Sequence, residues 1–190
     1  MSNAEHLSGV DYFLTGTDLS LVNPEPVIRK ADKVIYLFTD AQDHQFGAII
    51  YLPTAQPGDR TFAVHQEITI RKELLTTPLA PYITHALRQS DDGLLIDWPG
   101  EMLTTLQEQY YSIDTWKYNA MKEILLTLYE HSSMLPNEDT LTLSNLIYDA
   151  QGTTGFKFLS VQRGIYRNQH IYRRAIVNLT REMKPLINNT

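Results

Sequence analysis

The sequence contains no cysteine among its 190 residues. Disulfides, thiol nucleophiles and thiolate metal sites are therefore excluded. The sequence also lacks an apolar run long enough to cross a bilayer, the longest clear one being 48–52, and its N-terminus has no basic segment followed by an apolar one. These absences predict a soluble protein, and the missing cysteine fits a cytoplasmic location.

The motifs of several enzyme classes are missing as well. The sequence has no glycine-rich phosphate loop, no dinucleotide-binding fingerprint, no Gly-x-Ser-x-Gly elbow and no pair of histidines four residues apart around a glutamate. We therefore expect no catalytic residues, no bound metal and no cofactor. The sequence leaves open whether the chain is an enzyme, and it favours a protein that is not.

Charge is distributed unevenly along the chain. From Phe156 onward the sequence has seven basic residues and one acidic residue, a net charge of +6. The preceding 155 residues have nine basic and 21 acidic residues, a net charge of −12. Such asymmetry indicates an acidic partner, or a charge match within the fold or between subunits.

The order of the patterns predicts an α+β fold. An N-terminal antiparallel β-meander of three to four strands is expected to pack against a mostly helical C-terminal half. The predicted strands cover 33–39, 46–52, 60–71 and 94–98, and the predicted helices cover 81–89, 101–111, 114–131, 141–150 and 160–184. We expect a single domain over 1–190, with an irregular N-terminal arm (1–30), a sheet-rich part (33–98) and a helical part (101–187).

The last predicted helix, 160–184, is long, amphipathic and basic. At 100° per residue its apolar side chains gather on one side and its basic ones on the other. The apolar side comprises Val161, Ile165, Tyr172, Ile176, Leu179 and Met183, and the basic side comprises Arg163, Arg167, His170, Arg174 and Arg181. Planar guanidinium groups bind carboxylates and phosphates well, so we take this basic side as the candidate partner-binding surface.

A second candidate surface lies on the predicted strand 60–71. Strict alternation would place His65, Glu67, Thr69 and Arg71 together, apart from the alternating apolar residues. These are the residue types of an acid/base site. They support the alternative of an enzyme of unrecognised type.

The charge asymmetry and the missing motifs together favour a non-catalytic macromolecule-binding protein, such as an adaptor, inhibitor, immunity-type or secretion-accessory protein. Its partner would be an acidic protein or a second copy of the chain. Nucleic acid is a less favoured partner, because the acidic body would repel DNA, and a membrane is not expected. The sequence identifies neither the partner nor the oligomeric state.

Overall fold

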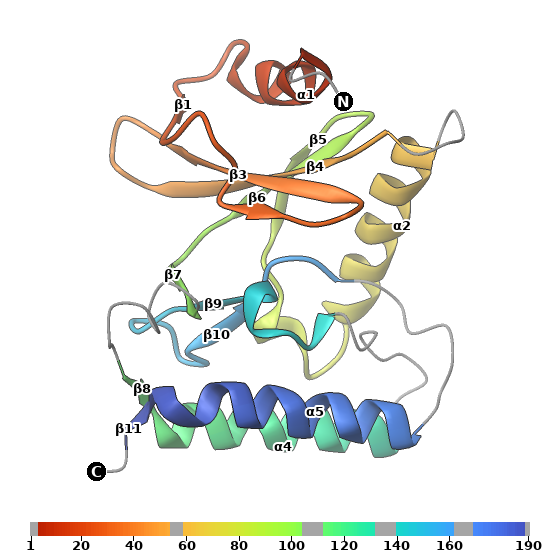
Figure 1. Ribbon diagram of the computed structural model, residues 1–190, viewed down its shortest axis with the longest axis vertical. Helices are drawn as coiled ribbons and strands as arrows, with labels where there is room; N and C mark the ends of the chain where they lie inside the picture. The colour runs from red at the N-terminus through yellow and green to blue at the C-terminus, as the bar shows by residue number, and fades with distance from the viewer. Residues whose placement is uncertain (1–3, 54–58, 104–111, 132–139, 162–168, 189–190) are drawn as a thin grey trace. The chain divides into compact units, whose positions relative to one another are not determined.

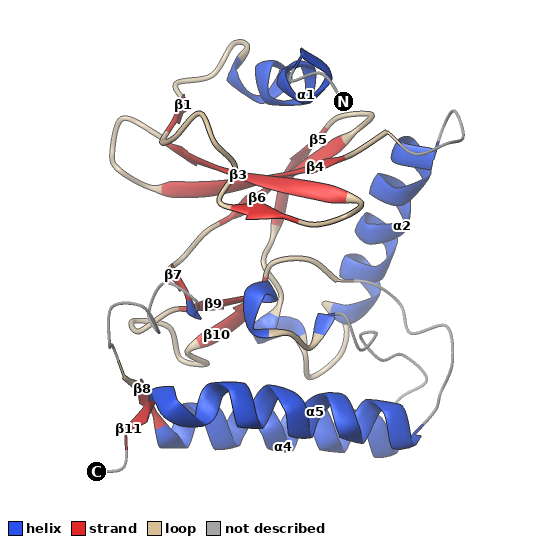
Figure 2. Cartoon of the chain, in the orientation of Figure 1, coloured by secondary structure: helices blue, strands red, loops and turns tan. Residues whose placement is uncertain are grey.

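A computed structural model describes residues 4–53, 59–103, 112–131, 140–161 and 169–188 (Figure 1). The chain divides into two compact units. Unit 1 comprises Met1–Thr69 and His85–Trp98, and unit 2 comprises Ile70–Thr84 and Pro99–Thr190. Antiparallel strands and α-helices both occur, which confirms the predicted α+β class (Figure 2).

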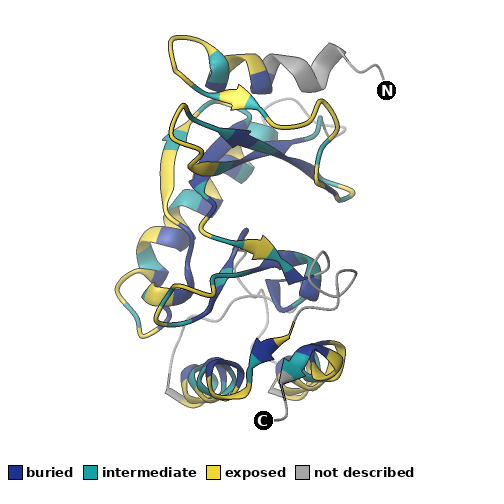
Figure 3. Cartoon of the chain, turned by 90° about the vertical axis from the view of Figure 1, so that its left-hand side faces the viewer, coloured by how far each residue is buried: buried dark blue, intermediate teal, exposed yellow. Residues whose placement is uncertain are grey.

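Unit 1 is built on an antiparallel sheet. Its strands follow the order β1-β3-β4-β6-β5, and β2 also pairs with β3. The strands are β1 (Ser20–Leu21), β2 (Ile28–Arg29), β3 (Lys33–Thr39), β4 (Gln45–Tyr51), β5 (Ala86–Gln89) and β6 (Gly93–Asp97). The predictions of strands at 33–39, 46–52 and 94–98 are therefore confirmed. Most residues of β3, β4 and β6 are buried (Figure 3).

The N-terminal segment is more regular than the sequence indicated. In place of a wholly irregular arm, the chain forms helix α1 (Ala4–Leu14). Val10 and Phe13 on this helix are buried in the core of unit 1 together with Phe38 and Ile50. Packing against the sheet therefore stabilises a segment whose sequence pattern alone is weak.

The predicted strand 60–71 is wrong, because these residues belong to helix α2 (Asp59–Leu74). Its buried residues are Val64, Glu67, Ile70, Arg71 and Leu74, which is the spacing of one helical face. Phe62, placed by alternation on the apolar side, is 66% exposed. The alternation was misleading because two polar residues occupy the buried face of the helix.

Unit 2 contains a three-stranded antiparallel sheet in the order β10-β9-β7 and a parallel pair of β11 and β8. Its first part carries the short helix η1 (Ala80–Tyr82), then β7 (Glu101–Met102), β8 (Ile113–Asp114) and helix α4 (Thr115–His131). Its second part carries η3 (Leu143–Asn145), β9 (Leu146–Tyr148), β10 (Phe156–Phe158), helix α5 (Gln169–Met183), η4 (Lys184–Leu186) and β11 (Ile187–Asn188). Helix 114–131 is thereby confirmed.

Two predicted helices are strands in the structure. The segment 81–89 holds one turn of η1 and then β5, and the segment 141–150 holds η3 and β9. Leu146 and Ile147 are adjacent and both fully buried, as in a strand covered on both faces. Of the predicted helix 101–111, residues 101–102 form β7, and 104–111 lie outside the described residues.

The C-terminal helix α5 begins at Gln169, so the predicted start at 160 is wrong. Ser160 and Val161 are buried outside any helix, and 162–168 are not among the described residues. Within α5 the buried residues are Tyr172, Ile176, Leu179 and Met183. Tyr172 stacks on Tyr129 of α4, with ring centroids 5.3 Å apart. Of the helices described, none has both the length and the hydropathy needed to span a bilayer.

The hydroxyl of Tyr172 is buried and has no hydrogen-bond partner among the described residues. Replacing Tyr172 by phenylalanine removes this unsatisfied group. We expect Tyr172→Phe to leave the free energy of unfolding unchanged or to raise it by up to about 1 kcal/mol. Chemical denaturation measures the effect. The matched control is Tyr148→Phe, which removes a hydroxyl that donates to Asp114 Oδ2 at 3.4 Å and is expected to destabilise slightly.

The same variant tests a pH dependence. Burial raises the pKa of Tyr172 above its ordinary value. Since the folded state then holds this proton more tightly than the unfolded state, stability is full below about pH 10 and falls as the pH rises further. Tyr172→Phe should therefore lose less stability at alkaline pH than the wild type. An equal loss in both proteins would contradict this role of Tyr172.

Candidate functional site

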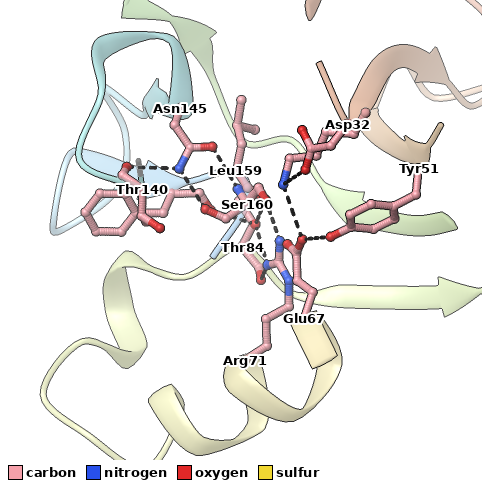
Figure 4. Close-up of polar contacts among 11 residues, drawn as sticks. Asp32, Tyr51, Glu67, Arg71, Thr84, Thr140, Asn145, Leu159 and Ser160 are labelled. Atoms are coloured by element: carbon pink, nitrogen blue, oxygen red, sulfur yellow. Dashed lines mark hydrogen bonds and ion pairs between the residues drawn. The ribbon is translucent and has the colours of Figure 1, made fainter. Parts of the chain in front are cut away.

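Unit 1 contains a buried charged cluster of Lys33, Glu67 and Tyr51 (Figure 4). The ammonium of Lys33 lies 3.9 Å from Glu67 Oε2, and their side chains are only 3% and 2% exposed. The hydroxyl of Tyr51 donates a short hydrogen bond to the same carboxylate oxygen. Asp32, at 4.0 Å from Lys33, adds a second, half-exposed carboxylate. Two opposite charges are thus held away from water beside a phenol.

Strand pairing explains how the cluster is assembled. Lys33 and Tyr51 are cross-strand partners on β3 and β4, and the lysine ammonium lies 5.2 Å from the centroid of the tyrosine ring. Glu67 comes from the buried face of α2, which follows β4 in the chain. A buried charge without a partner costs free energy, so removing either Lys33 or Glu67 is expected to destabilise the folded state.

Unit 2 contains a second buried cation, Arg71, one helical turn after Glu67. Its guanidinium donates to the carbonyl oxygen of Thr84 at 2.5 Å and to Thr84 Oγ1 at 2.8 Å. It also donates to the carbonyl oxygen of Leu159 (Figure 4). Thr84 Oγ1 in turn donates to the carbonyl of Phe158 at 2.8 Å. This network ties the end of β10 to the segment that follows η1.

A third polar cluster surrounds Asn145, also in unit 2 (Figure 4). Asn145 Nδ2 donates to the carbonyl oxygens of Thr140 at 3.0 Å and Ser160 at 2.7 Å. Its Oδ1 accepts the backbone N–H of Ser160 at 3.1 Å. All three residues are buried. The amide of Asn145 therefore joins the segment before η3 to the segment after β10.

The structure separates the four residues of the predicted strand face. His65 and Thr69 are exposed, whereas Glu67 and Arg71 are buried on another side of the helix. The acid/base surface predicted from alternation is therefore wrong. Glu67 and Arg71 are four residues apart, and the apolar residues around them recur every three or four residues. This helical spacing is the sequence signal that could have identified them. No sequence signal marked Lys33.

The predicted partner-binding surface is described only in part. His170, Arg174 and Arg181 are exposed on α5, while Arg163 and Arg167 lie outside the described residues. An open pocket of about 400 Å³ is lined by Leu141, Thr142, His170, Ile171, Arg174, Ala175, Asn178 and Glu182. Binding of an acidic partner, or self-association, through this surface stays a prediction.

No family model matches the chain, and no curated protein sequence matches it. Solved structures do resemble it, among them the Rio2 kinase in its ADP/Mg²⁺–phosphoaspartate complex, from Chaetomium thermophilum. The TM-score is 0.60 at 13% sequence identity. The likeness covers 100% of this chain and 64% of the kinase chain, so this chain spans less than two thirds of that kinase. At this identity the likeness shows a shared fold.

The likeness contradicts the function predicted from the sequence. A non-catalytic macromolecule-binding protein was expected from the charge asymmetry and the missing enzyme motifs, whereas the chain shares its fold with a solved kinase. The prediction is wrong because neither missing motifs nor uneven charge excludes a fold that kinases also have. A fold is determined by its core and strand pairing, and it does not require the motifs of its relatives.

Proposed function

We propose that this chain binds an adenine nucleotide through its kinase-like fold. The supporting observation is the buried ion pair of Lys33 and Glu67 in unit 1. In protein kinases a lysine on a strand of the sheet pairs with a glutamate on a helix, and both must be in place for activity. The solved neighbour is an ADP complex, which makes ADP the first ligand to test. We also propose that the protein is cytoplasmic, as the sequence predicts.

The lysine of this pair does not come from β4, the strand that leads into α2. Tyr51, at the end of the strand that leads into α2, bonds to Glu67, and the ammonium comes from Lys33 on the neighbouring strand. Because Lys33 and Tyr51 face each other across the sheet, the positive charge still lies beside the helix carboxylate. We assign Lys33 as the phosphate-binding cation of the proposed site.

The glycine-rich loop that covers the phosphates in protein kinases has no counterpart in the sequence. That loop has the pattern Gly-x-Gly-x-x-Gly, and here no two glycines are separated by a single residue. Residues 20–32, which include β1 and β2, contain no glycine at all. The proposed site therefore depends more heavily on the side-chain cation than a typical kinase site does.

Thermal unfolding in rising concentrations of ADP tests this proposal. The wild type should melt at higher temperature as ADP increases, with about 2.7 kcal/mol of stabilisation when ADP is about 100 times its dissociation constant. Lys33→Met should abolish this shift, since the phosphate loses its cation. Lys72→Met is the matched control, because Lys72 is exposed on α2, and it should keep the full shift.

The two possible failures of this experiment have different meanings. If the wild type shows no shift with ADP or ATP, the proposed function is wrong. If Lys33→Met folds and shifts as much as the wild type, the nucleotide binds and the assignment of Lys33 is wrong. Lys33→Arg keeps the charge and should retain part of the shift.

A further inference from the structure

Unit 1 contains an open pocket between the first turns of helix α2 and the turn that joins β5 to β6. Its volume is about 430 Å³, which lies within the range of pockets that hold ligands in proteins. All of its lining residues belong to unit 1. The charged and aromatic side chains among them, with one serine hydroxyl, come from α1 (Tyr12), from α2 (Arg60 and His65) and from the turn (Ser90, Asp91 and Asp92).

Two adjacent carboxylates on the turn give the pocket its negative charge. The side chain of Asp92 is 16% exposed, and two partners fix its position. The hydroxyl of Ser90 donates to Asp92 Oδ1 at 2.8 Å, and Arg60 Nη1 donates to Asp92 Oδ2 at 3.5 Å. Asp91 is exposed and lines the same pocket. The pocket therefore offers one fixed and one accessible carboxylate, and carboxylates bind ammonium and guanidinium groups.

Two arginines of unit 1 show which chemistry the pocket walls accept. The guanidinium of Arg60 lies 3.5 Å from Asp92, and its side chain is 38% exposed, so this ion pair contributes little to stability. The guanidinium carbon of Arg88 lies 4.6 Å from the centroid of the Tyr12 ring, which is a cation–π contact. A carboxylate and an aromatic ring of the pocket thus each attract a guanidinium group.

The overall charge of unit 1 favours the same kind of ligand. Unit 1 has five basic and 12 acidic residues, a net charge of −7, whereas unit 2 has 11 basic and 10 acidic residues, a net charge of +1. The negative charge of the chain therefore belongs to the unit that contains the pocket. Such a charge attracts basic molecules and disfavours anions.

Exposed apolar side chains near the pocket favour a protein over a small amine. Phe62 follows the lining residue Thr61 on α2 and is 66% exposed, and Leu87 precedes the lining residue Gln89 by two residues and is 52% exposed. Protein interfaces combine apolar contacts with polar and charged ones. A protein segment can cover such side chains in addition to filling the pocket.

We infer that this pocket binds an arginine or lysine side chain of a basic protein partner. Asp91 and Asp92 supply the counter-charge, and the ring of Tyr12 supplies an aromatic face. Arg60 competes with the incoming cation for Asp92. The inference is independent of the proposed nucleotide site, because none of the pocket's lining residues belongs to the Lys33 cluster.

Calorimetric titration of the full chain with a peptide of alternating arginine and glycine, acetylated and amidated at its ends, tests the inference. We expect saturable binding that weakens as NaCl is added. Asp91→Asn should weaken this binding at least about fivefold. Asp18→Asn is the matched control, since it removes the same charge from an exposed position of unit 1 outside the pocket, and it should change the dissociation constant by less than about twofold.

Arg60→Gln gives a test with the opposite sign. Removing this guanidinium frees the carboxylate of Asp92, so the arginine peptide should bind at least about threefold tighter. The same peptide with glutamate in place of arginine should not bind. If the glutamate peptide binds instead, and Arg60→Gln abolishes its binding, the pocket is an anion site and the inference is wrong.

The remaining outcomes separate the alternatives. No saturable binding of the arginine peptide at millimolar concentration, or an equal effect of Asp91→Asn and Asp18→Asn, would overturn the inference. If agmatine, a small molecule with a guanidinium and an amine, binds as tightly as the peptide, the ligand is a small cation and the protein partner is wrong. If light scattering shows a dimer that Asp91→Asn dissociates, the occupant is a second copy of this chain.

Discussion

Replacing Glu67 by glutamine is expected to lower the free energy of unfolding by about 3 kcal/mol or more. The variant keeps the size and the hydrogen-bonding capacity of the side chain, so Tyr51 can still donate to it. What is lost is the negative charge 3.9 Å from the ammonium of Lys33, whose side chain is 3% exposed. A buried charge deprived of its partner costs far more than a surface charge.

Equilibrium denaturation in urea measures this effect, and Glu73→Gln is the matched control. Glu73 lies on the same helix and is more exposed than Glu67, so the same chemical change should cost less than about 0.5 kcal/mol. If Glu67→Gln were as stable as the control, the buried pair would contribute little.

Replacing Arg71 by methionine should destabilise the protein by about 3 kcal/mol. The apolar stem of the side chain is retained, but the hydrogen bonds to Thr84 and to the Leu159 carbonyl are lost. Those acceptors are buried, so each one left unsatisfied adds a desolvation cost. The damage should be greatest in unit 2, where both acceptor segments lie.

A denaturation curve measures the overall effect of Arg71→Met on stability. Hydrogen exchange of the backbone amides at the end of β10 measures its local effect. Protection there should fall, because the guanidinium connects the β10 end to the segment after η1. Lys72→Met changes the neighbouring, exposed lysine and should leave both protection and stability unchanged. Equal behaviour of the two variants would show that the Arg71 network contributes nothing to stability.

The strands 33–39, 46–52 and 94–98 and the helix 114–131 could be predicted from the sequence because local pattern and final environment agree there. β-branched and aromatic residues fill β3 and β4, and the buried residues of α4 repeat at helical spacing. Trp116 near the start of α4 is 60% exposed.

The errors have physical causes that a single sequence conceals. In α2 the buried face carries Glu67 and Arg71, so the apolar residues that remain visible alternate like a strand. In β9 two adjacent residues, Leu146 and Ile147, are fully buried, a pattern that a short run shares with a helix. In both segments, burial in the folded protein determined the secondary structure, and the local sequence pattern did not.

The candidate site was missed for a related reason. Lys33 begins a strand, Tyr51 ends one and Asn145 ends a short helix, so their proximity to Glu67 or Ser160 depends on pairing between distant segments. A lysine or an asparagine at such places is ordinary in sequence. Only burial and the hydrogen bonds around them single them out.

Nucleotide binding is the central claim, and calorimetric titration of the full chain with ADP tests it most directly. We predict saturable binding at one site, lost in Lys33→Met but not in Lys72→Met. A titration without binding heat at several temperatures, for ADP and ATP and both with and without Mg²⁺, would contradict the account.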